Sequence, residues 1–220
     1  PIDQFLSLSK RELQPAKTAM PDLACSPSNP SATQWSRPLK FLAASAFFFG
    51  AAQAAVVVYY PLLLIAKFDI SQALVQRSFS SLGLGYLIGA IAVGFLPHRY
   101  TTDALMTMSA SIGIAGVWLC VVSPNLLSAS LGGFLFGLWN GSMISLLLDR
   151  INQSSEAQHA RVTWSRFSII LSLGFTISIS CLSPISNNNV VMIVWIGLWL
   201  TLIHLSCQAM SRYLFSLRTP

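Results

Sequence analysis

The chain has 220 residues, of which 54% are hydrophobic and only 9% are charged. Soluble domains carry roughly 25% charged residues, so this composition excludes an ordinary water-soluble globule and is typical of a membrane protein. The net charge of +6 does not indicate a nucleic-acid-binding protein, because the basic residues lie beside hydrophobic runs rather than in a cluster with aromatic side chains. The four cysteines lack C-x-x-C spacing, so we expect no metal site and no cofactor.

Residues 1–39 are polar and contain six of the eleven prolines. This composition is typical of a flexible linker. We predict a polar cytoplasmic linker over 1–39, a transmembrane bundle over 40–212 and a cytoplasmic tail over 213–220. The chain begins with Pro1 rather than methionine, and its first residues lack the apolar core of a secretory signal. We therefore expect a fragment or a processed product.

Six apolar runs follow the linker, separated by short polar breaks. About 20 apolar residues are needed for a helix to cross roughly 30 Å of hydrocarbon, and each run reaches or nearly reaches this length. The runs lack the alternation of barrel strands, so an all-α fold integral to the membrane is predicted. The predicted spans are Phe41–Ala66, Ser78–Pro97, Ala104–Val122, Leu126–Leu148, Phe167–Leu182 and Val190–Met210. The fifth run is the shortest, and its helix is expected to begin earlier, near Val162.

The basic residues predict the orientation, because Lys and Arg gather in the cytoplasmic loops of membrane proteins. Eleven basic residues fall on one side of the predicted spans, and only Lys67 and Arg77 fall on the other. We therefore place both termini, and the loops after the second and fourth spans, in the cytoplasm. A bacterial inner membrane is the expected location.

Small residues recur every four positions within the spans, and all thirteen glycines lie there. Gly85-x3-Gly89 and Gly133-x3-Gly137-x3-Gly141 each place small side chains on one helix face. Such faces let helix backbones approach closely in lipid. We predict close helix packing at these faces, with sliding during a transport cycle as the alternative interpretation.

Polar side chains inside a span cost free energy and are the first candidates for a functional site. Gln53 lies near the centre of the first span, and Tyr59 follows toward its outer end, where Pro61 is expected to kink the helix. In the fourth span Asn140 stands beside Trp139. Two interpretations remain open for both amides: hydrogen bonding between helices, or the lining of a hydrated cavity.

Two further polar features lie in the last two spans. Ser168, Ser172, Thr176 and Ser180 recur every four residues, so they share one face of the fifth helix. Hydrogen bonds between helices are the simpler interpretation of this hydroxyl stripe. In the sixth span His204 is either a packed imidazole or a proton relay, since an imidazole titrates near neutral pH.

The cytoplasmic loops carry two recognisable motifs. Gly94-Phe95-Leu96-Pro97-His98-Arg99 follows the second span, and Asp149-Arg150 follows the fourth. With six spans after a long linker, they resemble the C-terminal half of a major facilitator superfamily transporter, whose loop motif has the form G-x-L-x-D-R-x-G-R-R. Gly94, Leu96 and Arg99 match this motif, whereas His98, Thr101 and Asp103 stand at its acidic, glycine and basic positions.

The resemblance implies a mechanism and a set of partners. The family joins two six-helix bundles and moves its substrate by alternating access, with the first and fourth helices of each half lining the central cavity. It would therefore place Gln53, Tyr59, Trp139 and Asn140 on the substrate path. It would also place the hydroxyl stripe against the second half.

The expected function is secondary transport of an amphipathic or neutral small molecule, and the protein is not expected to be an enzyme. The expected partners are the lipid bilayer, a small-molecule or lipid-like substrate and a second six-helix half. The character of the first two spans is also similar to bacterial lysophospholipid transporters.

Two other functions fit six spans. A rhomboid-like serine protease has a nucleophilic Ser on its fourth helix and a His on its sixth, as Ser142 and His204 stand here. However, Trp139-Asn140-Gly141-Ser142-Met143 lacks the G-x-S-G motif of that family. A non-transporting membrane subunit is the other alternative, and it predicts no stabilisation by a solute.

Overall fold

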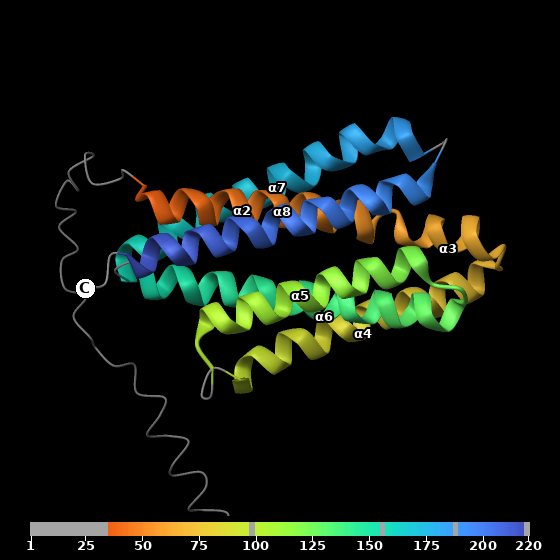
Figure 1. The fold of residues 1–220 in the computed structure, drawn as a ribbon, viewed down its shortest axis with the longest axis horizontal. Helices are drawn as coiled ribbons and strands as arrows, with labels where there is room; N and C mark the ends of the chain where they lie inside the picture. Colours follow the sequence, from red (N-terminus) through yellow and green to blue (C-terminus); the bar gives the residue numbers. More distant parts are fainter. Residues whose placement is uncertain (1–34, 97–99, 155–156, 187–188, 218–220) are drawn as a thin grey trace, which may run out of the picture. The chain divides into compact units, whose positions relative to one another are not determined.

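The structure is a computed structural model that describes residues 35–96, 100–154, 157–186 and 189–217. These residues form seven α-helices and no strands (Figure 1). The helices are α2 (Arg37–Val57), α3 (Tyr60–Phe68), α4 (Gln72–Phe95), α5 (Thr102–Val122), α6 (Leu126–Ser154), α7 (Ala157–Ser186) and α8 (Val190–Ser216).

Six stretches of these residues are long and apolar enough to cross a membrane. The first, Arg37–Phe68, combines α2 and α3, and each of the other five lies in one helix. The six predicted spans are therefore confirmed, although several helices are longer than their apolar runs. The largest difference is in α7, which extends from Ala157 to Ser186. Helices continue into the polar membrane surface because backbone hydrogen bonding does not require apolar side chains, so hydropathy alone underestimates their length.

The first span is interrupted near its C-terminal end, as Pro61 predicts. Pro61 lies in the first turn of α3 and has no N–H to bond the carbonyl of Val57, where α2 ends. At the other end of α3, Asp69 adopts a left-handed conformation with φ of 48°. Asp tolerates this conformation better than most residues, and it turns the chain toward α4.

Two helices form the centre of the bundle. One is α2 with its continuation α3, and the other is α6. α2 packs against α7 and α8, α6 packs against α4 and α5, and α5 meets α8 (Figure 1). In their most apolar windows the spans of α2–α3 and of α6 are 61% buried, against 22% for α4 and 17% for α7. The peripheral helices α4 and α7 therefore present most of their side chains to their surroundings.

The packing has an internal two-fold relation. Exchanging α2 with α6, α7 with α4 and α8 with α5 maps the main helix pairs onto one another: α4–α6 onto α2–α7, α2–α8 onto α5–α6, and α5–α8 onto itself. A Cβ at Gly50 of α2 would collide with the carbonyl of Leu171 on α7, and a Cβ at Gly137 of α6 would collide with the carbonyl of Leu82 on α4. Since α2 and α6 run in opposite directions (Figure 1), the two three-helix units form an inverted repeat.

The amino-acid sequence carries the same repeat. Residues 47–53 on α2 read FFFGAAQ, and residues 134–140 on α6 read FLFGLWN. Residues 82–86 on α4 read LGLGY, and residues 171–175 on α7 read LSLGF. The repeat makes Gln53 and Asn140 equivalent, each three residues after the glycine that packs against the neighbouring helix.

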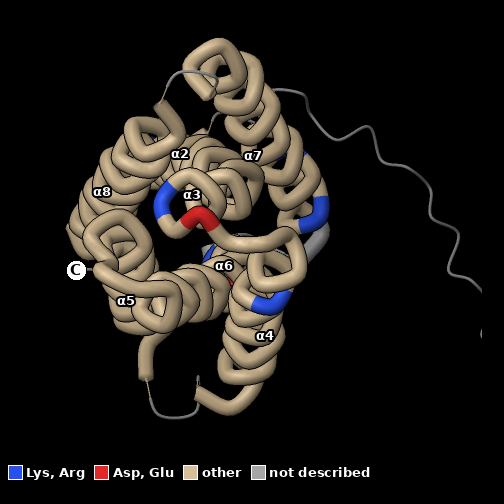
Figure 2. The backbone as a smooth tube through the Cα atoms, turned by 90° about the vertical axis from the view of Figure 1, so that its right-hand side faces the viewer, with Lys and Arg blue, Asp and Glu red and all other residues tan. Residues whose placement is uncertain are grey.

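The charged residues are unevenly divided between the ends of the bundle. Of the eight basic residues that the structure describes, Arg37, Lys40, Arg150, Arg161, Arg166 and Arg212 lie at the end where α2 begins and α8 finishes. Lys67 and Arg77 belong to the opposite end, which Figure 2 faces. The orientation predicted from these residues, in which the end with most basic residues is cytoplasmic, stays a prediction.

Candidate substrate site

The most unusual side chain of the central helices is that of Asn140. It is only 1% exposed, yet neither its Oδ1 nor its Nδ2 atom has a hydrogen-bond partner among the described residues. A buried polar group without a partner costs about 1–3 kcal/mol. An amide that is retained at this cost needs an explanation beyond helix packing.

Trp139 lies next to Asn140 and is completely buried. Its ring packs edge-on against Phe49 and Phe136, with ring centroids 4.9 Å and 5.2 Å away. Gly113 of α5 leaves room for the indole, because a Cβ there would collide with it. The Nε1 atom of Trp139 has no described partner either. Trp139 is thus a packed neighbour of the amide, with one donor free.

The two tyrosines after Gln53 lie in different places. Tyr59 is buried beside Ala55, Leu182 and Ile193, where α7 and α8 meet α2. Tyr60 is also fully buried, and its hydroxyl donates a 3.0 Å hydrogen bond to the carbonyl of Ala129 on α6.

Gln53 is half-buried on α2. The structure therefore brings Tyr60, rather than the predicted Tyr59, to α6. The break between α2 and α3 lies between Gln53 and Tyr60, so the regular spacing of one helix could not distinguish Tyr60 from Tyr59.

His204 belongs to a separate buried group between α2, α6 and α8. Its Nδ1 atom lies 2.9 Å from both the hydroxyl and the backbone carbonyl of Ser45. Its Nε2 atom lies 3.0 Å from Nε2 of Gln208, which also donates to Sδ of Met143 at 3.2 Å. The ring stands 5.6 Å from Trp139, measured between centroids.

The hydrogen bonds of Ser142 and His204 bear on the serine-protease alternative. The Ser142 hydroxyl donates to the carbonyl of Trp139 and shares a hydrogen bond with the hydroxyl of Ser109 on α5. His204 bonds to Ser45 and Gln208 instead. Because a nucleophilic serine must bond to its base, this arrangement does not favour a protease.

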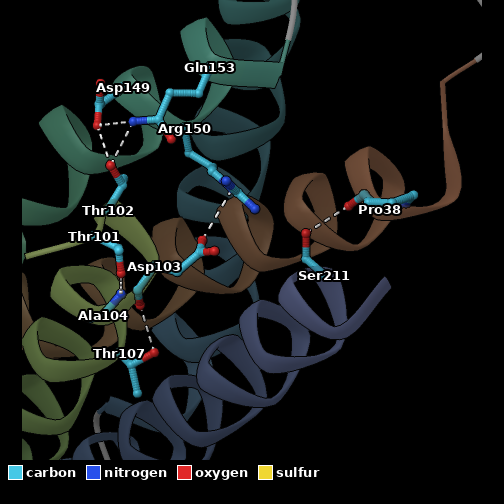
Figure 3. A network of polar contacts seen from close by, with 10 residues as sticks. All are labelled: Pro38, Thr101, Thr102, Asp103, Ala104, Thr107, Asp149, Arg150, Gln153 and Ser211. Carbon is cyan, nitrogen blue, oxygen red and sulfur yellow. Dashed lines mark hydrogen bonds and ion pairs between the residues drawn. The ribbon is translucent and has the colours of Figure 1, made fainter. Parts of the chain in front are cut away.

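The end of the bundle with most basic residues holds a second polar network (Figure 3). The Asp149 carboxylate accepts hydrogen bonds from Thr102 and Gln153. Nε of Arg150 lies 3.2 Å from Asp103 of α5, and its guanidinium stacks over Phe215 of α8, 4.4 Å from the ring centroid. Three helices are therefore tied together by the predicted Asp149-Arg150 motif.

The motif after the second span differs from Asp149-Arg150 in its contacts. A Cβ at Gly94 would meet nothing within 4 Å, so no close contact requires glycine there. Arg99 lies outside the described residues. Asp103, which stands at a basic position of the family motif, instead supplies the acid for Arg150.

The ion pair is expected to contribute modestly to stability. Its side chains are 16% and 25% exposed, and partly screened pairs contribute about 0.2–1 kcal/mol. We expect a double-mutant cycle of Asp103→Asn and Arg150→Gln, followed by denaturation in detergent, to give a coupling near the upper limit. Strict additivity of the two substitutions would show that the contact stabilises nothing.

The hydroxyl stripe of α7 borders an open hollow on the periphery. Ser165, Ser168, Ser172 and Thr176 line this hollow together with Ile169 and Leu173. Two of the stripe's hydroxyls donate within the helix, Ser168 to Trp164 and Ser180 to Thr176. Placement of this face against a second half remains a prediction.

Among the described residues, six membrane-capable stretches with buried, unpartnered polar atoms on the central helix α6 define a helical membrane protein with several spans. The family model described as "Uncharacterised MFS-type transporter YbfB" matches residues 8–193. The chain therefore belongs to this family of major facilitator superfamily transporters, which confirms the resemblance predicted from its loops and spans. No curated protein matches the chain. The narrower similarity to lysophospholipid transporters stays a prediction.

Proposed function

We propose that this chain is one six-helix half of a secondary transporter that works by alternating access, and that Asn140 and Gln53 contact the solute. Asn140 carries the proposal, because its amide is buried and unpartnered on a central helix. A solute with both a donor and an acceptor would satisfy Nδ2 and Oδ1 together.

The inverted repeat adds a second argument. Transporters built from inverted repeats bind their solutes near the membrane centre, where the repeats meet. Gln53 and Asn140 occupy equivalent positions of the repeated segments on the two central helices. Two amides at equivalent positions suit a solute that lies close to the two-fold axis.

The chemistry of the central helices indicates the solute class. The described acidic and basic residues lie near the ends of the spans, so an ionised solute would find no opposite charge beside the amides. At the depth of the two amides the neighbouring side chains are aromatic, namely Phe49, Phe136 and Trp139. A neutral or amphipathic solute with a small polar head fits this combination best.

Uptake into vesicles tests the proposal. The complete transporter that contains this half, purified and placed in lipid vesicles, should take up at least one of three solute classes, lysophospholipids, siderophores or drug-like cations, and should exchange labelled for unlabelled solute. Exchange is expected because alternating access carries solute in both directions. Gln53→Leu should slow both processes, whereas Gln76→Leu, which removes an exposed amide from α4, should not. Equal rates in all three proteins would refute the assignment of Gln53.

A further inference from the structure

A buried imidazole on α8 takes no part in the proposed contact with the solute. His204 is completely buried. We assign the proton of the ring to Nδ1, because the Ser45 carbonyl at 2.9 Å can only accept a hydrogen bond. Its Nε2 atom faces the Gln208 amide nitrogen at 3.0 Å, which can only donate. The arrangement therefore holds a neutral ring whose Nε2 lone pair accepts.

The Gln208 amide that contacts His204 uses only one of its two polar atoms. It is 6% exposed, and its Oε1 atom has no described hydrogen-bond partner. A half-turn of the amide about its last bond would exchange Oε1 and Nε2. It would then present an acceptor to His204, which a protonated ring requires because both of its nitrogens donate. The same side chain can thus serve either protonation state of the ring.

Gln208 also lines a small pocket at the end of the bundle that carries most of the basic residues. Leu42, Met106, Thr107 and Ser211 form part of its wall. The charged groups of this wall are Asp103 from α5, Arg150 from α6 and Arg212 from α8. Toward His204 itself, α2 presents Ser45 and Phe49, and α6 presents Trp139. His204 is not among the lining residues, so Gln208 is the link between the pocket and the buried ring.

We propose that His204 and Gln208 form a proton-binding site served by this pocket. A proton carried as hydronium in the pocket passes the Gln208 side chain, binds the Nε2 lone pair and leaves a water molecule behind. The ring becomes a cation, and the Gln208 amide turns to accept the new N–H. Release reverses these steps. The carboxylate in the wall of the pocket, Asp103, is paired with Arg150. One part of the proposal rests on the proposed transport function: in a transporter, a proton bound at this site is the coupling ion.

Nitrogen NMR of the full chain in lipid bilayers tests this site directly. Label on the three histidines gives few signals, and His204→Gln identifies that of residue 204. Between pH 8 and pH 4, His204 should change from the Nδ1–H neutral form to the imidazolium form. Gln208→Met, which removes the acceptor, should weaken proton binding at least about tenfold, which is one pH unit of midpoint. Gln76→Met should leave the midpoint unchanged.

Two results would overturn the proposal. One is a His204 signal that stays neutral down to pH 4 while circular dichroism shows that the helices persist. The other is an unchanged midpoint in Gln208→Met. The titration needs no solute, so its outcome is separate from that of the uptake experiment. A titrating His204 in a protein that moves nothing would refute transport alone.

Discussion

Gly137→Ala is expected to destabilise the protein by about 2–3 kcal/mol, the upper part of the range for overpacking a core. A Cβ at this position would collide with the carbonyl of Leu82 on α4. The obstacle is backbone rather than a flexible side chain, so the two helices must separate. The same contact occurs in reverse, since a Cβ at Gly85 would meet the carbonyl of Phe134 on α6.

Gly83→Ala is the matched control, because it makes the same substitution in the same pair of helices. A Cβ at Gly83 would meet nothing within 4 Å, and alanine favours a helix over glycine by about 0.5–1 kcal/mol. Denaturation by SDS in mixed micelles should therefore show a loss for Gly137→Ala and none for Gly83→Ala. Similar losses at both positions would contradict the helix contacts described here.

Asn140→Leu is expected to have two opposite effects. It should increase the free energy of unfolding by about 1–3 kcal/mol, because it removes a buried amide without partners and substitutes an apolar group of similar size. It should also abolish solute uptake, since both hydrogen bonds to the solute are lost. Gln76→Leu should change neither property. A loss of stability in Asn140→Leu would show that the amide has structural partners.

The membrane architecture was predictable from the sequence because hydropathy depends on composition over about 20 residues. Hydropathy located six spans, and Pro61 located the break in the first span. The ends of the helices were less predictable. α7 continues over polar residues near the membrane surface, where hydropathy carries no signal for helix.

The candidate site was predictable in part. Gln53 and Asn140 stand out because amides are rare in hydrocarbon, but the choice of Tyr59 over Tyr60 required knowledge of the break between α2 and α3. The inverted repeat was visible in residues 47–53 and 134–140, and it would have paired the two amides. The partner of Asp103, and the Met143 sulfur that Gln208 contacts, come from helices distant in sequence, so only the packed structure reveals them.

The most direct test of the solute site compares thermal unfolding of three proteins with and without a transported solute. A solute at 100 times its dissociation constant stabilises the protein that binds it by about 2.7 kcal/mol. Wild type and Gln76→Leu should both show this increase in melting temperature, and Asn140→Leu should show none. An equal increase in all three would contradict the assignment of Asn140 to the solute site.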